Sequence, residues 1–121
     1  MVAGVLRSSL LAGVLCLSAG SPLFGHHSLA TEFQVDQTIT LDGVVTKLDW
    51  SNPHARLYIE GSDPSGAKQL WDFEMASPNL LLLHGWKINT FRKGDHVEVS
   101  AHPSRDGSHH AFATKVTLVR H

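Results

Sequence analysis

The sequence predicts a small all-β domain, a barrel of five strands with one short helix between the third and the fourth strand. Alternating apolar and polar residues recur in five segments, and a single capped helical pattern interrupts them. The length of 121 residues fits one domain. A single cysteine excludes a disulfide framework and a thiolate zinc site.

The first strand is expected over residues 38–50, and its alternation changes parity once. Ile39 and Leu41 share one parity, and the opposite parity is carried by Val44, Leu48 and Trp50. A slip of one residue at Asp42 and Gly43 would bring both sets to the same face, as a glycine bulge does in a curved strand.

The other four strands are expected over residues 54–60, 69–75, 96–102 and 110–119. A turn rich in glycine, proline and aspartate follows the second strand, and residues 105–108 form a hairpin turn before the last strand. The side chains expected to point into the core are Ala55, Leu57, Ile59, Trp71, Phe73, Met75, Val97, Val99, Ala101, Phe112, Val116 and Leu118.

The helix is expected directly after the third strand. Ser77 is a favourable N-cap, Pro78 suits the first helical position, and Gly85 suits the left-handed residue that ends a helix. Residues 80–83 are leucines, which need an apolar cavity such as the open end of a barrel. The order strand-strand-strand-helix-strand-strand, with a bulged first strand, is that of an OB-like barrel. A flat sandwich would leave the helix without a place.

Residues 1–25 have the layout of a secretory signal peptide. Arg7 precedes a short apolar run over residues 10–17, and small or breaking residues follow. The run is too short to span a bilayer, and Leu15 before Cys16 argues against a lipid anchor on that cysteine. Cleavage after Gly20 and cleavage after Gly25 both remain open. We expect a periplasmic or secreted protein without a membrane anchor, with an N-terminal arm over 26–37 and the barrel domain over 38–121.

Several short motifs occur together in the remaining chain. They are His26-His27-Ser28, the segment 50–55 with its Asn-Pro-His sequence, Phe73-Glu74, Ser77-Pro78-Asn79, Gly85-Trp86 and Lys93-Gly94-Asp95. In this combination the chain resembles a family of small exported bacterial proteins that is classed as a domain of unknown function. The resemblance implies that His26 is the mature N-terminus, although residues 23–25 depart from the alanine-type cleavage site of that family. It implies no established activity.

His26 and His27 are the first candidates for a metal site. An N-terminal histidine offers its free amine and its ring nitrogen to one ion, and a second imidazole can complete a nitrogen site that suits copper(II). His54 follows the Asn-Pro turn and is the best third ligand. The alternative is an exposed polar N-terminus without a ligand.

Two other groups of polar residues are weaker candidates for a functional site. His102, His109 and His110 flank the second hairpin, and if they meet across it they could hold a zinc or copper ion weakly. The alternative is a solvated loop tip, where polar residues are usual. Asp72 and Glu74 share the outward face of the third strand, where paired carboxylates could do acid–base work. Such work would need a pocket, and alternating polar residues are expected on a half-exposed strand in any case. The sequence contains no nucleophile motif and no phosphate-binding glycine loop, so we do not expect the protein to be an enzyme.

Two functions are compatible with these observations. The first is an exported protein that binds copper through His26, His27 and His54 and handles or stores it; oxidase chemistry at the same site would also need a redox substrate pocket. The second is a non-catalytic OB-like module that binds an envelope protein or a small molecule in a groove lined by Trp86, Tyr58 and Arg56. With 10 Lys+Arg, 11 Asp+Glu and a formal charge of −1, we expect no nucleic-acid partner.

Overall fold

The computed structural model describes residues 29–62 and 65–120. The predicted signal peptide and its cleavage site, together with His26 and His27, lie outside the described residues. Among the helices that are described, none is long and apolar enough to cross a bilayer.

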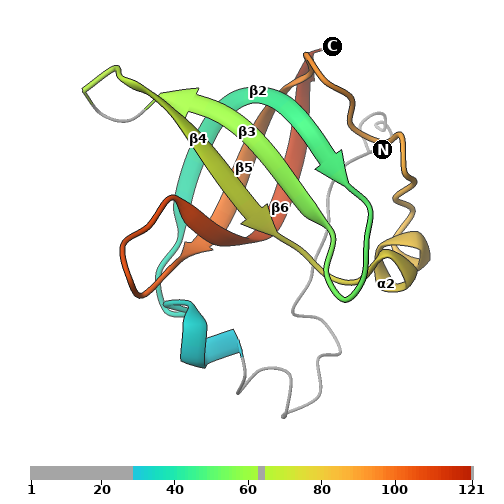
Figure 1. Ribbon diagram of the computed structural model, residues 1–121, viewed down its shortest axis with the longest axis horizontal. Helices are drawn as coiled ribbons and strands as arrows, with labels where there is room; N and C mark the ends of the chain where they lie inside the picture. Colours follow the sequence, from blue (N-terminus) through green and yellow to red (C-terminus); the bar gives the residue numbers. More distant parts are fainter. Residues whose placement is uncertain (1–28, 63–64, 121) are drawn as a thin grey trace, which may run out of the picture.

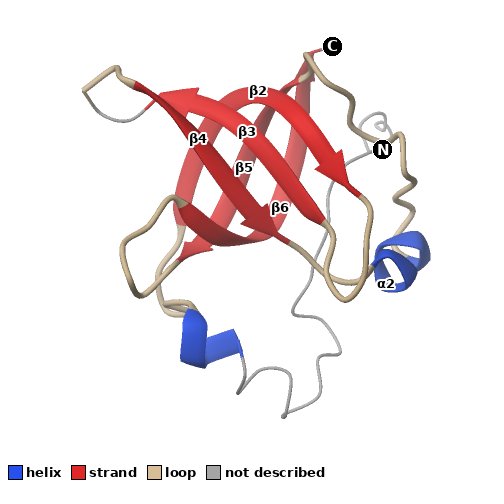
Figure 2. Cartoon of the chain, viewed as in Figure 1, coloured by secondary structure: helices blue, strands red, loops and turns tan. Residues whose placement is uncertain are grey.

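Five strands close into a barrel, as predicted (Figure 1). They are β2 (Ile39–Asp49), β3 (Arg56–Ser62), β4 (Lys68–Glu74), β5 (His96–Pro103) and β6 (His110–Arg120). Around the barrel the order is β2-β3-β4-β6-β5, and β5 pairs with β2 to close it. The β4–β6 pair is parallel and the other four pairs are antiparallel. Figure 2 shows the sheet wrapped around one interior, so the predicted OB-like architecture is confirmed.

The core consists of the inward residues of all five strands. Eight side chains that the sequence predicts to point inward are fully buried. They lie on or directly beside β3 (Ala55, Leu57 and Ile59), on or directly beside β4 (Phe73 and Met75) and on β5 (Val97, Val99 and Ala101). Trp71 is partly buried and stacks on Phe73 at a ring-centroid distance of 5.8 Å.

The bulge in the first strand lies further along than the sequence predicts. The β2–β3 register shifts between Val45 and Lys47, so Thr46 is the extra residue and Val45, not Val44, is the buried position. Gly43 keeps the parity of the first half of β2, where it allows a close approach of β3. The slip was misplaced because glycine marks a close backbone approach as well as a bulge.

The inward face of the last strand also differs from the prediction. Ala111 and Ala113 are buried in the barrel, and Phe112 points to the opposite side. The β5–β6 register shifts between Ser100 and Ala101, which leaves Thr114 as an extra residue and restores Val116 to the core. The prediction placed Phe112 inside because it is apolar. Its ring lies on the outer side of the barrel instead, where it packs against the ring of Phe33.

The helix α2 (Pro78–Leu83) begins as predicted. The Ser77 side chain accepts a hydrogen bond from the Leu80 amide at 3.3 Å, and Gly85 has a φ of 90°. Only one of its leucines fills the barrel end, since Leu81 is fully buried while the other three are exposed. The expectation that all of these leucines are buried is therefore wrong.

An N-terminal arm precedes the barrel and lies beside β6. Residues 29–32 form a helical turn, and Phe33 makes an isolated bridge to Ser104. The Phe33 ring is 1% exposed, with ring centroids 5.2 Å from His110 and 5.7 Å from Phe112. Arg105 donates through Nε to the Ala30 carbonyl at 2.8 Å. The arm is thus fixed against the β5–β6 end of the barrel.

Candidate metal site on the outer face of the barrel

Polar side chains from three strands meet on the outer face of the barrel. Asp72 and Glu74 alternate with core residues along β4 and therefore point outward. Arg56 on β3 is the register partner of Glu74, and His110 on β6 is the register partner of Asp72. The barrel topology therefore brings an acidic strand between a guanidinium and an imidazole.

Glu74 is the centre of this group. It is 7% exposed, and its Oε2 lies 2.5 Å from His54 Nδ1. Its Oε1 lies 3.5 Å from Arg56 Nη2 and 3.5 Å from His110 Nε2. A buried carboxylate is costly unless cations or hydrogen-bond donors surround it, so Glu74 is held where up to three such groups converge.

Glu32 reaches the same place from the N-terminal arm. Its Oε2 lies 3.4 Å from His110 Nε2, and its side chain is about half exposed. One ligand atom each from Glu32, Glu74 and His110 lies within 4.8 Å of the other two. We refer to these three residues as the EEH cluster.

Asp72 orients the imidazole of the EEH cluster. His110 Nδ1 lies 3.4 Å from Asp72 Oδ2 and 3.2 Å from the Asp72 carbonyl oxygen. Arg56 Nη1 donates to the same Oδ2 at 2.6 Å. When Nδ1 carries its proton toward Asp72, the lone pair of Nε2 faces Glu32 and Glu74. A carboxylate behind a histidine is the usual arrangement in metal sites, where it fixes the ring and its tautomer.

The donor set suits a divalent transition metal. Imidazole nitrogen and carboxylate oxygen together bind zinc and copper(II), and the chain has no cysteine in the described part that would select a softer ion. Glu32, Asp72 and Glu74 bring three carboxylates, against the single guanidinium of Arg56. A cation would offset the remaining negative charge.

The predicted site residues have different outcomes. His54 lies beside the EEH cluster, in contact with Glu74, whereas His26 and His27 lie outside the described residues. The three histidines of the second hairpin do not gather. His102 binds the Gln37 carbonyl at 2.7 Å, the His109 ring lies 4.9 Å from that of Trp71, and only His110 joins the site.

The roles of Glu32 and His110 could not be read from the sequence. These two residues are separated by most of the chain, and the pattern gave no path for the arm. The outward pairing of Asp72 and Glu74 was visible in the sequence, but not the convergence of their partners.

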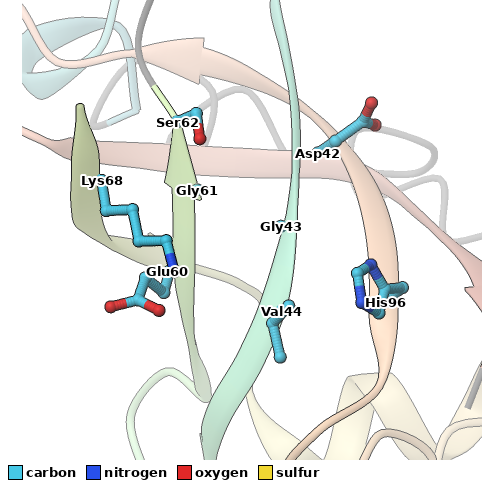
Figure 3. A pocket seen from close by; sticks show the side chains of 8 residues that line it. All are labelled: Asp42, Gly43, Val44, Glu60, Gly61, Ser62, Lys68 and His96. Carbon is cyan, nitrogen blue, oxygen red and sulfur yellow. The ribbon is translucent and has the colours of Figure 1, made fainter. Parts of the chain in front are cut away.

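The predicted groove of Trp86, Tyr58 and Arg56 does not form, because Trp86 is 2% exposed and packs on Phe91. A pocket lies elsewhere on the barrel, over β2, β3, the start of β4 and the start of β5 (Figure 3). Its lining residues are Asp42, Gly43, Val44, Glu60, Gly61, Ser62, Lys68 and His96.

A family model of sequences matches residues 13–113, and its description is a family of unknown function, DUF6152. The chain belongs to this family. The predicted resemblance to a family of unknown function is confirmed for most of the chain. A comparison with curated protein sequences finds no match.

Two solved structures with a similar fold are named as single-stranded DNA-binding proteins. Two crystal forms of Rim1, the mitochondrial single-stranded DNA-binding protein of S. cerevisiae, match this DUF6152 chain with a TM-score of 0.51 each. Identity is 14% and 15%, over 69% of this chain and 94% and 93% of Rim1. The N-terminal domain of PriB from Thermoanaerobacter tencongensis has 18% identity and a TM-score of 0.49, over 71% of this chain and 99% of that one.

The two Rim1 likenesses support the OB-like fold, and they correct one prediction. Nucleic acid was excluded as a partner on the overall charge, but single-stranded DNA-binding proteins share this barrel. The exclusion is wrong because the net charge of a whole chain does not describe the charge of one binding face.

Proposed function

We propose that this protein is an exported, periplasmic or secreted metal-binding protein whose site is the EEH cluster. The observation that carries the proposal is the convergence of Glu32, Glu74 and His110, with their ligand atoms within 4.8 Å of one another. Export is supported by the basic start and the short apolar run over residues 10–17.

The position of the cluster within the fold supports a binding role. OB-type barrels bind their ligands on the outer face of the second and third strands and on the adjoining loops. Glu74 lies on the third strand, β4, and His54 lies in the loop between β2 and β3. His110 begins β6 directly after the β5–β6 loop. The acidic cluster thus occupies the binding face of the fold and favours a cation there.

His26 and His27 are proposed to complete the site, with His54 as a third imidazole. His26 lies six positions before Glu32. Residues 29–32 form a helical turn, so the reach of the terminus beyond that turn is set by residues 26–28, which span about 10 Å at most. Cleavage after Gly25 would therefore leave the new amine and two imidazoles within reach of the cluster. A nitrogen-rich set of this kind favours copper(II), whereas the EEH cluster alone also suits zinc.

The test combines intact mass with metal titration. Protein recovered from the exported fraction is stripped with a chelator and titrated with copper(II) and with zinc, by native mass spectrometry and calorimetry. We expect one tightly held ion and a weaker affinity, by about tenfold or more, in the Glu32→Gln variant, because loss of one metal partner typically has that effect. Glu98→Gln, an exposed carboxylate on β5, is the matched control.

Histidine variants distinguish the contribution of the EEH cluster from that of the proposed histidine ligands. His54→Ala and His26→Ala should weaken copper(II) binding, while His84→Ala, at an exposed position after α2, should not. Unchanged affinity in Glu32→Gln would refute the EEH cluster. A mass that begins at Ser21, or unchanged affinity in His26→Ala, would remove the N-terminal histidines from the site and leave the cluster as a zinc-type site.

The fold favours a second candidate, single-stranded nucleic acid binding. Rim1 shares the barrel, and Tyr58 lies on the outer face of β3 with Lys47 Nζ 5.9 Å from its ring centroid. Bases stack on exposed aromatic rings in such proteins. Fluorescence anisotropy with a labelled oligonucleotide tests this candidate: binding that weakens in Tyr58→Ala supports it, and no binding at low salt rejects it.

A further inference from the structure

Exposed apolar side chains gather at the end of the barrel that carries α2. Six large hydrophobic residues are exposed in the described part of the chain, and four of them lie within residues 80–88. These are Leu80 at 38%, Leu82 at 52%, Leu83 at 83% and Ile88 at 66% exposure. Exposed apolar side chains that cluster in this way mark a surface that contacts a partner or a membrane.

The same segment is exclusively basic among its charged residues. No aspartate or glutamate occurs between Glu74 and Asp95, a stretch that contains Lys87, Arg92 and Lys93. All three cations are exposed, and within 29–62 and 65–120 no ion pair involves them. The chain as a whole has a formal charge of −1, so this positive charge is local.

The segment is held firmly on the core beneath it. Leu81 is fully buried, and Trp86 and Phe91 are 2% and 3% exposed with their rings packed edge to face. At its far end the Val45 amide donates to the Asp95 carbonyl at 2.8 Å. Figure 1 shows α2 and the following segment running along one side of the barrel toward β5. The exposed leucines and cations are therefore presented from a fixed surface.

We propose that this α2 surface, residues 79–94, docks on an anionic lipid bilayer. Leucine side chains insert among the lipid chains at the interface, and lysine and arginine attract anionic headgroups. Charge complementarity selects this partner, because the segment that exposes the apolar side chains also exposes three cations and contains no carboxylate side chain. No residue of the α2 surface belongs to the EEH cluster, so the proposal does not depend on metal binding.

Residues 10–17 are also apolar, so binding of the full chain to vesicles would not by itself implicate the α2 surface. The experiment therefore measures the protection of the α2 surface directly. Hydrogen exchange of the full chain is measured by mass spectrometry with vesicles of phosphatidylcholine, with and without phosphatidylglycerol. We expect peptides covering 79–94 to gain protection on the phosphatidylglycerol vesicles, and peptides from β5 and β6 to stay unchanged. The protection should be lost in the double variant Leu82→Ser/Leu83→Ser and in the triple variant Lys87→Gln/Arg92→Gln/Lys93→Gln.

The matched control is Leu70→Ser, which removes a leucine that is 60% exposed on β4, outside the α2 surface. It should keep the protection. Thermal melting checks that each variant is folded, which we expect because the altered side chains are exposed. Absence of protection on phosphatidylglycerol vesicles overturns the proposal. Protection that appears without lipid and rises with protein concentration also overturns it, and assigns the surface to a second copy of the chain.

Discussion

The carboxylate of Asp106 forms hydrogen bonds within the loop beside the candidate metal site. Asp106 Oδ1 accepts a hydrogen bond from the Ser108 amide at 2.9 Å and one from the Ser104 hydroxyl at 2.8 Å. Hydrogen bonds to the charged form, chiefly from Ser108, lower the pKa of Asp106 from 3.8 to about 2. The ionised side chain thus shapes the turn that leads into His110.

This pKa predicts how the turn responds to acid. Folding favours the ionised form, so the contribution of Asp106 is fully present above pH 3.8 and declines as the pH falls from 3.8 to about 2. An NMR titration should show the Ser108 amide changing near pH 2. In Asp106→Asn that change should disappear and the amide should exchange faster. A Ser108 midpoint near 4 in the parent protein would contradict the assignment.

Gly43 is a second residue whose identity the packing dictates. A Cβ placed there would lie 2.3 Å from Ile59 Cγ2 and 2.6 Å from the Glu60 carbonyl oxygen. We expect Gly43→Ala to lower the free energy of unfolding by about 1–3 kcal/mol, the usual cost of overpacking a dense region. Urea unfolding measures the loss. Thr40→Ala, at an exposed position on β2, should change it by less than about 0.5 kcal/mol.

The arm is an element whose position depends on one buried ring. Phe33 is 1% exposed and contacts both His110 and Phe112. We predict that Phe33→Ala releases the arm, with a cost of up to about 3–5 kcal/mol for a buried phenylalanine. Hydrogen exchange should increase over residues 29–37 while β2 and β3 stay protected.

The same variant tests the link between the arm and the candidate site. Because Glu32 comes from the arm, Phe33→Ala should also weaken metal binding, although it removes no ligand. Full metal affinity with a released arm would show that Glu32 does not contribute. Leu29→Ala, a partly exposed residue of the same arm, is the control.

The elements were predictable to the extent that local pattern determines them. The N-cap Ser77 and the left-handed Gly85 defined α2 correctly, since caps act through adjacent backbone groups. A bulge in the first strand was predicted, but its position at Thr46 and the second bulge at Thr114 were not, because a register shift is fixed by the partner strand. Phe112 is apolar like a core residue, and it lies on the outer side of the barrel because Phe33 packs against it there.

The candidate site was predictable only for its local part. His54 follows a turn that the sequence displays, and its outward direction follows from the strand alternation. Glu32 and His110 meet only after the barrel has closed and the arm has packed beside β6. No residue pattern near either one reports a contact over that sequence distance. The position of His26 and His27 stays a prediction.

On the scale of the whole molecule, the EEH cluster joins the arm to the barrel. Glu32 belongs to the arm, Glu74 to β4 and His110 to β6. Without an ion, the two carboxylates repel each other across the space between them. An ion bound to all three would bind the folded chain alone, because the unfolded chain does not hold these residues together. Metal binding should therefore stabilise the entire fold.

The size of this stabilisation follows from the thermodynamic linkage between metal binding and folding. Free metal at one hundred times its Kd adds about 2.7 kcal/mol to the free energy of unfolding. For a domain of this size each kcal/mol raises Tm by about 4–8 °C, so we predict a rise of about 10–20 °C in chelator-stripped protein on saturation with zinc or copper(II). Differential scanning calorimetry measures it. Glu32→Gln should lose most of the rise and Glu98→Gln should keep it. Magnesium should produce little, because it binds imidazole poorly; an equal rise with magnesium would mean that the carboxylates act through charge alone and that His110 is no ligand.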